Sequence, residues 1–176
     1  MDSTAEVKSI LITGCSTGIG LHLARGLRDQ GYRVFASTRK EVDVKKLEAE
    51  GFESLVLDLS SSDSINSAVR ILFQKTEHLY ALINNGAYGQ VGALEDISRT
   101  AMEEQFQANF FGWHELTNLI LPSMKKYNNG RVIYISSVLG FVALPFRGPY
   151  IASKFAVEGL VDTLRLELRH TNIKLS

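Results

Sequence analysis

Short apolar runs alternate with helical segments along the whole of this 176-residue sequence. Strands that are apolar throughout, and that alternate with helices, are typical of a parallel sheet covered on both faces. Strands are predicted at 8–13, 32–37, 54–58, 79–84 and 131–136; helices are predicted at 18–30, 42–50, from a serine cap within 60–62 to 77, at 100–122 and from 150 onward. The sequence therefore predicts an α/β fold with a doubly wound parallel sheet.

The end of the sequence bears on how complete this sheet is. No repeat, low-complexity tract or linker interrupts the chain, so residues 1–176 are expected to form a single domain. A sixth strand begins at 173–175, just before the last residue, Ser176. A doubly wound sheet that ends so early in a strand leaves helix faces and a strand edge uncovered. We therefore expect the fold to be truncated in its sixth strand.

Composition argues against several classes of function. The 19 basic and 19 acidic residues give a net charge of zero, which provides no general attraction to nucleic acid or to an anionic membrane. No apolar run has membrane-spanning length, and residues 1–6 are too polar for a signal peptide. The single cysteine, Cys15, permits no internal disulfide and fits a cytoplasmic location. The four histidines lack ligand spacing, so we expect no metal site.

A glycine-rich segment follows the first predicted strand. Residues 13–20 read TGCSTGIG, with the glycine spacing G-x-x-x-G-x-G. Glycines at a strand-to-helix turn let the backbone approach a ligand closely, and the helix N-terminus attracts phosphate groups. The alternative is a glycine-rich turn without a ligand, and Cys15 is expected to be a small filler of the loop. The candidate cofactor-binding residues here are Gly14, Ser16, Thr17, Gly18, Ile19 and Gly20.

The end of the second predicted strand bears on cofactor choice. A dinucleotide-binding fold usually places an acidic residue there to bind the ribose 2′-hydroxyl of NAD, whereas an arginine suits the 2′-phosphate of NADP. Residues 37–40 read STRK, and no acidic residue precedes Glu41. This pattern favours NADP(H) over NAD(H), with Arg39 as the candidate contact. A solvated basic turn is the alternative.

Tyr150 and Lys154 are four residues apart at the predicted start of a helix, where Pro149 favours helix initiation. This spacing places both side chains on the same helix face. An ammonium group about 4 Å from a phenol, at an effective dielectric constant of about 20, contributes roughly 4 kcal/mol to stabilising the phenolate, or about three pKa units. The pair is therefore a candidate proton donor and acceptor near neutral pH.

Several motifs together resemble the short-chain dehydrogenase/reductase family. They are the 13–20 loop, Asn84-Asn85-Gly86 after the fourth strand, Asn109, Ser137 and Tyr150-x-x-x-Lys154, in the order and spacing of that family. The resemblance covers essentially the whole chain. The stretches at 109–112 (NFFG) and 150–159 (YIASKFAVEG) are most similar to the branch of 17β-hydroxysteroid and retinol dehydrogenases and to bacterial oxidoreductases like them.

This resemblance implies a Rossmann fold and reversible hydride transfer between C4 of nicotinamide and a carbonyl or alcohol carbon. Tyr150 would exchange the proton, while Lys154 would lower the pKa of Tyr150 and hold the nicotinamide ribose. Ser137, 13 positions before Tyr150, would hydrogen-bond the substrate oxygen. Asn109 would help hold a water that relays protons to the lysine; the alternative for Asn109 is a hydrogen-bonded core asparagine.

The resemblance also implies contacts on the adenosine side of the cofactor. They would come from Asp58, for which a plain turn or cap residue is the alternative, and from Asn85, Gly86 and Ala87. The usual Asn-Asn-Ala-Gly reads Asn-Asn-Gly-Ala here, at residues 84–87. If the family's glycine needs a positive φ, Ala87 would be strained at that position.

The substrate and the partners follow less directly. The apolar loop between Ser137 and Tyr150 favours a hydrophobic carbonyl or alcohol substrate such as a steroid, retinoid or fatty aldehyde, although it could equally be core. The helix at 100–122 and the helix from 150 carry extra apolar faces, which would form a homodimer or homotetramer interface or would be core for a missing segment. A non-catalytic dinucleotide-binding regulatory protein and an inactive truncated fragment are the competing functions.

Overall fold

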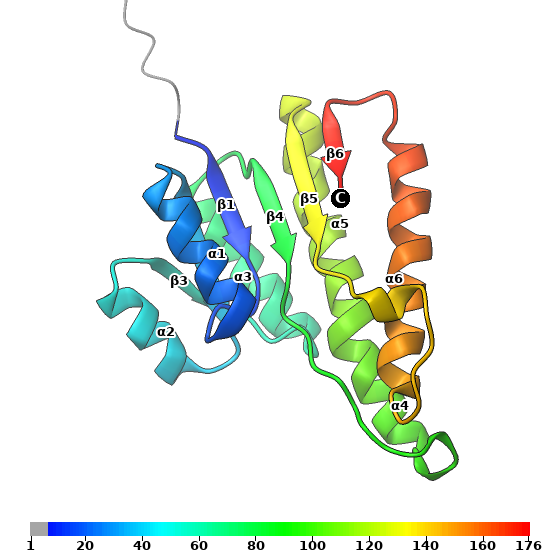
Figure 1. Ribbon diagram of the computed structural model, residues 1–176. Helices are drawn as coiled ribbons and strands as arrows, with labels where there is room; N and C mark the ends of the chain where they lie inside the picture. Colours follow the sequence, from blue (N-terminus) through cyan, green and yellow to red (C-terminus); the bar gives the residue numbers. More distant parts are fainter. Residues whose placement is uncertain (1–6) are drawn as a thin grey trace, which may run out of the picture.

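The computed structural model describes residues 7–176, so the N-terminal stretch 1–6, from which no signal peptide was expected, lies outside the described residues. Six parallel strands form one sheet in the order β3-β2-β1-β4-β5-β6 (Figure 1). The predicted parallel α/β sheet is therefore confirmed, including the sixth strand. The strands are β1 (Ser9–Ile12), β2 (Arg33–Thr38), β3 (Glu53–Val56), β4 (Ala81–Asn84), β5 (Gly130–Tyr134) and β6 (Ile173–Leu175).

Helices connect the strands, as the alternation predicts. Ser61 caps α3 by accepting a hydrogen bond from the backbone N–H of Ser64, and Pro149 occupies the first turn of α6, which begins two residues before Tyr150. The helices are α1 (Gly18–Asp29), α2 (Glu41–Ala49), α3 (Ser62–Lys75), α4 (Arg99–Phe106), α5 (Gly112–Tyr127) and α6 (Gly148–Glu167). Short 3₁₀ segments are η1 (Leu94–Asp96) and η3 (Val138–Gly140), and η2 (Gln107–Phe111) is a π-helical segment.

The helix predicted at 100–122 differs from the structure in two ways. It is interrupted by η2, and it does not end at Pro122 but continues to Tyr127. A proline within a helix removes one backbone donor, but the turns around it are held by the burial of Leu121 and Met124. The helix instead ends at Tyr127 and is followed by Asn128, whose left-handed backbone (φ 44°) is typical of a C-terminal cap.

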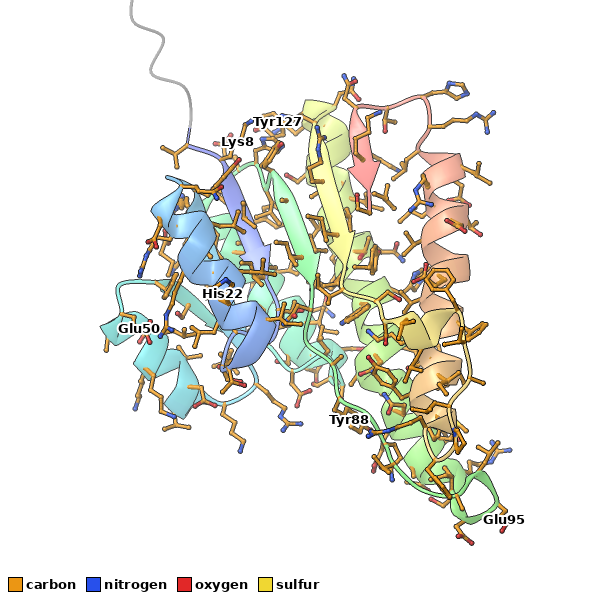
Figure 2. All side chains as sticks on the ribbon, viewed as in Figure 1. Lys8, His22, Glu50, Tyr88, Glu95 and Tyr127 are labelled. Carbon is orange, nitrogen blue, oxygen red and sulfur yellow. The ribbon has the colours of Figure 1, made fainter. Side chains whose placement is uncertain are left out.

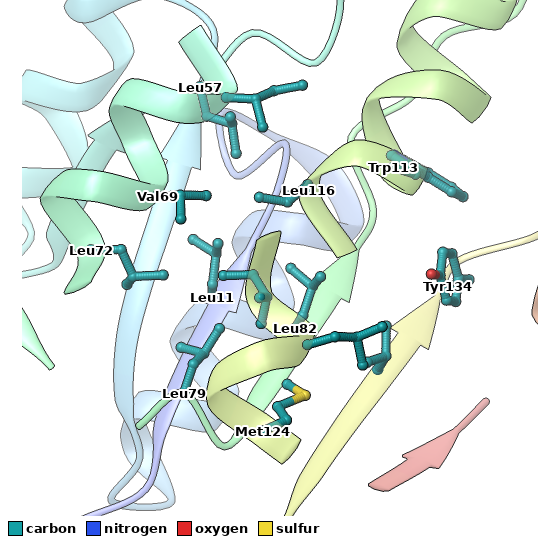
Figure 3. Close-up of a cluster of buried hydrophobic side chains, with 14 of the residues drawn as sticks. Leu11, Leu57, Val69, Leu72, Leu79, Leu82, Trp113, Leu116, Met124 and Tyr134 are labelled. Atoms are coloured by element: carbon teal, nitrogen blue, oxygen red, sulfur yellow. The ribbon is translucent and has the colours of Figure 1, made fainter. Parts of the chain in front are cut away.

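The two faces of the sheet bury separate sets of side chains because successive residues of a strand point to opposite faces. In β1, Ile10 and Ile12 pack with residues of α1 and α2, whereas Leu11 packs with residues of α3, α5 and α6. Figure 3 shows part of the second set, with Leu11 and Leu82 of the sheet among side chains of α3 and α5. The helices therefore cover both faces of the sheet.

The order of the strands determines where a site can form. Because the chain crosses from β3 on one side of β1 to β4 on the other, the connections after β1 and β4 diverge at the carboxyl edge of the sheet. Figure 1 shows the segment after β4 leaving this edge to reach α4, beside the start of α6. Ligands of doubly wound sheets bind in the crevice at such a switch point.

Candidate active site

The glycine-rich loop after β1 has the backbone conformation that its glycines permit. Gly14 and Gly18 have φ values of 72° and 61°, in the left-handed region that favours glycine. Gly20, inside α1, packs so closely that an added Cβ would lie 2.6 Å from Asn85 Nδ2 and would overlap the carbonyl oxygen of Gly14. Cys15 is fully buried and its burial raises the pKa of its thiol to about 12, as suits a loop filler rather than a nucleophile.

Thr13, which the sequence analysis did not single out, joins the loops after β1 and β4. Its Oγ1 accepts hydrogen bonds from the backbone N–H groups of Asn85 and Gly86, both at 2.9 Å. In return, Asn85 Nδ2 donates to the carbonyl oxygens of Thr13 (2.9 Å) and Gly14 (3.2 Å). The only sequence signal for this role is that Thr13 is the polar residue directly after an apolar strand.

The strain considered for Ala87 is absent. The residues with positive φ in the part of the chain that the structure describes are five glycines, Asn128 and Phe146, and neither Gly86 nor Ala87 is among them. The Asn-Asn-Gly-Ala order is therefore compatible with this backbone. Gly86 is also held by Trp113, whose Nε1 donates to its carbonyl oxygen at 2.9 Å.

A cleft of about 370 Å³ lies at the switch point. Four of the predicted cofactor-binding residues do not line it: Gly18, Gly20, Tyr150 and Lys154. Gly18 and Gly20 instead shape the loop. The predicted residues that do line it are Gly14, Ser16, Thr17, Ile19, Arg39, Asp58, Asn85, Gly86 and Ala87. Further lining residues, which the motifs did not indicate, are Leu57, Leu59, Ser60, Tyr88 and Ala108.

Arg39 and Asp58 both line this cleft, but only Asp58 has a partner within the described fold. Arg39 is exposed at the end of β2, and no ion pair engages it among residues 7–176. Asp58 Oδ1 accepts a hydrogen bond from the backbone N–H of Ser60 at 2.9 Å, so Asp58 also serves the turn, which was its alternative role. Arg39 is therefore the free charged donor of this cleft.

Lys154 is buried behind the helix start, with 1% of its surface exposed. Its Nζ donates to the carbonyl oxygen of Ile135 at 2.8 Å and lies 4.3 Å from the centre of the Trp113 ring. Its distance to the centre of the Tyr150 ring is 5.5 Å, in agreement with the predicted shared face. Burial lowers the pKa of Lys154 to about 8, and the nearby carboxylate of Glu158 acts in the opposite direction.

Tyr150 lies at a second cavity, of about 330 Å³, which adjoins the first. The two cavities share Ala87 and Tyr88. Ser137 is half-buried at the start of η3, where its Oγ accepts a hydrogen bond from the backbone N–H of Leu139 at 3.1 Å. The remaining residues around the second cavity are Gly89, Leu139 and Arg147, none of which the sequence motifs indicated.

Asn109 is fully buried within η2 and holds the segment after β4. Its Nδ2 donates to the carbonyl oxygen of Tyr88 (2.7 Å), and its Oδ1 accepts from the backbone N–H of Tyr88 (3.1 Å). Gln105, which the sequence analysis missed, donates to the same carbonyl at 2.9 Å. Figure 2 shows Tyr88 on this segment, below the sheet. The Asn109 side chain is thus a hydrogen-bonded core asparagine, and its relay role stays a prediction.

Comparison with known proteins decides the family. The family model for short chain dehydrogenases matches residues 8–176. The chain belongs to the short-chain dehydrogenase family. The resemblance inferred from the sequence motifs is therefore confirmed, and so is the expected Rossmann-type sheet.

Individual members of the short-chain dehydrogenase family show the same relationship. The uncharacterized oxidoreductase YbbO of Escherichia coli (strain K12) is 47% identical over 170 residues, covering 96% of this chain and 63% of YbbO. Human retinol dehydrogenase 8 is 37% identical over 182 residues, covering 98% of this chain and 58% of that protein. The chain thus spans less than two thirds of the length of these two relatives.

A solved structure of the family also matches closely. The crystal structure of a metagenomic short-chain oxidoreductase in complex with NADP has a TM-score of 0.88 and 28% identity, and the match covers 96% of this chain and 79% of that one.

Neither a membrane-spanning helix nor a cluster of metal ligands is found in the part of the chain that the structure describes. Within residues 7–176, no helix is long and apolar enough to cross a membrane. In the same range, no three His, Cys, Asp or Glu side chains gather as metal ligands.

Proposed function

We propose that this chain is an NADP(H)-dependent oxidoreductase that transfers hydride between nicotinamide and a hydrophobic carbonyl or alcohol compound. One observation carries the proposal: the cleft beside the glycine-rich loop continues, through Ala87 and Tyr88, into the cavity that contains Tyr150. A bound dinucleotide would then extend from Arg39 in the first cleft to Tyr150 in the second cavity. The family membership of the chain supports the same proposal.

The residues of the first cleft suit a nicotinamide dinucleotide. Gly14, Thr17 and Ile19 line the cleft at the turn and at the start of α1, and a helix N-terminus is where backbone N–H groups can donate to phosphate oxygens. No side chain protrudes at Gly18, around which an added Cβ would meet no atom within 4 Å. Asp58 and the Asn85–Ala87 backbone would line the adenosine side. When bound, the nicotinamide would supply or accept the hydride.

Arg39 supports the preference for NADP(H), because its guanidinium would pair with a 2′-phosphate. We expect Arg39→Ala to weaken NADPH binding by about tenfold or more while leaving NADH binding nearly unchanged. Fluorescence titration with each cofactor measures both affinities. Lys45→Ala, which removes an exposed charge from α2, is the control and should keep the wild-type ratio. Equal losses for NADPH and NADH in the Arg39 variant would contradict the preference.

Four residues would take part in proton transfer to and from the substrate oxygen, each with its own role. In reduction, the Tyr150 hydroxyl would give its proton to the substrate oxygen as the carbonyl carbon receives the hydride, and in oxidation it would accept that proton. Lys154, with a pKa of about 8, is mostly protonated at neutral pH, so its charge would stabilise the phenolate. Ser137 would donate a hydrogen bond to the substrate oxygen, and Asn109 would support the proton relay.

The surroundings of Tyr150 favour a hydrophobic substrate. The loop that leads to α6 exposes large apolar side chains, with Phe141 at 68%, Leu144 at 51% and Phe146 at 63% exposure. Exposed apolar groups beside a catalytic cavity suit an apolar ligand. The similarity to human retinol dehydrogenase 8, whose name denotes an apolar alcohol, points in the same direction.

The test is Tyr150→Phe, which removes only the hydroxyl group. We expect the variant to bind NADPH like the wild type and to lose activity on a panel of hydrophobic aldehydes and ketones by at least about a hundredfold. Tyr127→Phe is the control, because within residues 7–176 that hydroxyl hydrogen-bonds only Glu77, at the opposite edge of the sheet from Tyr88 (Figure 2). Full turnover by the Tyr150 variant would refute the assignment. Cofactor binding by the wild type without any turnover would favour the regulatory alternative.

A further inference from the structure

Arg147 is the only charged residue between Ser137 and Tyr150, in a loop that is otherwise largely apolar. It is half-buried at the N-cap of α6, three residues before Tyr150, and lines the same cavity. The motif residues give it no role. A charged side chain in this position needs a physical explanation, because the energy of a half-buried charge depends on its partner.

The guanidinium of Arg147 and the ring of Tyr150 face the same small space. A Cβ added at Gly89 would lie 3.4 Å from Tyr150 Cδ2 and 3.9 Å from Arg147 Nη1. Both groups therefore lie within 4 Å of a single point beside Gly89. A ligand that reaches Tyr150 through this cavity also reaches Arg147.

Within residues 7–176, the Arg147 side chain makes no hydrogen bond and no ion pair. Two other arginines of the fold are engaged in this way: Arg25 pairs with Glu50, and Arg33 pairs with Glu53, each through two hydrogen bonds. A guanidinium carries five N–H donors in a planar fork and no acceptor, so its natural partner is an anion with two oxygens. Nothing on the described chain supplies that anion to Arg147.

The backbone before Arg147 is also unusual. Phe146 has φ 61°, a left-handed conformation that is rare for a bulky residue. It is held by a hydrogen bond from the backbone N–H of Gly92 to the carbonyl oxygen of Phe146, at 3.1 Å. Backbone strain of this kind is concentrated at ligand-binding positions. Here the Phe146 conformation sets the direction of the backbone immediately before Arg147.

We propose that Arg147 binds a carboxylate of the substrate, so that this site takes amphipathic oxo acids or hydroxy acids in which an apolar segment joins the reacting carbon to the carboxylate. This inference rests on the proposed function, because it names the substrate class of the same site. The carboxylate pairs with the guanidinium, the reacting oxygen reaches Tyr150, and the apolar segment lies against Leu139 and Ala87 of the cavity lining. Arg147 thereby acts as a specificity-determining residue rather than a catalytic one.

Matched pairs of substrates test the proposal. Para-carboxybenzaldehyde is compared with methyl para-formylbenzoate, and azelaic semialdehyde with its methyl ester, each with NADPH as reductant. We expect kcat/KM for the acid to exceed that for the ester by about tenfold or more, chiefly through KM, and to decrease with added salt because the guanidinium is partly exposed. Arg147→Met should abolish this preference by lowering kcat/KM much more for the acids than for the esters, and Arg147→Lys should retain part of it.

Two controls keep the inference separate from the proposed function. Arg99→Met removes an arginine whose side chain is 89% exposed on α4, and it should keep the preference for the acid. Calorimetric titration of benzoate in the presence of NADP⁺ reports anion binding without turnover, and this binding should be lost in Arg147→Met.

Ester turnover without a preference for the acid would overturn the inference and leave the oxidoreductase proposal standing. Loss of NADPH affinity in Arg147→Met would overturn it too, because the residue would then serve the cofactor. Benzoate binding that depends on Arg147, without reduction of any aldehyde, would support the anion site and count against the oxidoreductase.

Discussion

The side chain of Lys154 is almost fully buried, so its ammonium group is poorly solvated. Burial favours the neutral amine, whereas the Ile135 carbonyl oxygen, the Trp113 ring and the Glu158 carboxylate favour the ammonium. The outcome is a pKa of about 8, well below the ordinary value of a lysine. The position of Lys154 thus makes the stability of the fold depend on pH.

This dependence gives a prediction with a definite sign. Between the folded pKa of about 8 and the unfolded value of 10.5, the unfolded chain binds more protons, so stability rises as the pH increases through this window. Without cofactor, we expect the free energy of unfolding of the wild type, relative to Lys154→Met, to rise by about 1 kcal/mol from pH 7 to pH 9. Urea denaturation at the two pH values measures it.

The comparison with Lys154→Met isolates this group, because the other titrating side chains are common to both proteins. Lys125→Met, which replaces an exposed lysine of α5, should follow the pH dependence of the wild type. A constant difference between wild type and Lys154→Met across the window would show that the ammonium is not destabilised by burial.

Single residues of the site could be predicted only where a local pattern marks them. Local patterns mark residues such as Gly14, Arg39 and Tyr150, because each follows a predicted strand or begins a predicted helix. The parallel order of the strands then brings these positions to one edge of the sheet. The role of Thr13, in contrast, depends on the N–H groups of Asn85 and Gly86, about seventy residues away. Gln105 was missed for the same reason, since an isolated polar side chain does not reveal its distant partner. Arg147 was missed because only the fold brings it beside Gly89 and Tyr150.

At the scale of elements, glycines determine how closely α1 approaches the loop after β4. Gly20 leaves no room for a side chain, since an added Cβ would overlap the carbonyl oxygen of Gly14 and crowd Asn85. Gly26 lies in the same helix but faces solvent, with no atom within 4 Å of an added Cβ. The two positions therefore form a matched pair with opposite expectations.

We expect Gly20→Ala to destabilise the fold by about 1–3 kcal/mol, because the loop must move to accommodate the methyl group. The same shift should weaken NADPH binding, since Gly14 and Asn85 line the cleft. Gly26→Ala should instead stabilise the fold by up to about 1 kcal/mol, because alanine favours an exposed helix position. Thermal unfolding and NADPH titration measure both effects. A Gly20→Ala protein with wild-type stability would contradict the packing described at α1.

The ends of helices and strands could be predicted where a local capping residue marks them. They were harder to predict where tertiary packing overrides the local signal. The strand-to-helix alternation, the serine cap of α3 and the proline at the start of α6 were all visible in the sequence. Pro122 was a misleading signal, because burial of Leu121 and Met124 maintains the helix around it. The π-helical turn around Asn109 has no local marker, and the residue that Asn109 bonds there, Tyr88, is distant in the sequence.

At the scale of the whole molecule, the helix layers leave apolar side chains on the outside. Phe111 and Phe155 are each 48% exposed, on η2 and α6, which pack against each other. Phe106, Phe110 and Phe111 also form edge and tilted ring contacts. An exposed aromatic surface of this kind favours association.

We expect the chain to form a homodimer or homotetramer through this surface, since a second copy would cover both phenylalanines around a symmetry axis. The double variant Phe111→Ser, Phe155→Ser should then shift the sedimentation equilibrium toward monomer. Val42→Ser is the control, because Val42 is 57% exposed on α2, on the other face of the sheet, and should leave the mass unchanged. A monomeric wild-type mass at every concentration tested would exclude this assembly. An equal effect of Val42→Ser would place the contact on a different face of the molecule.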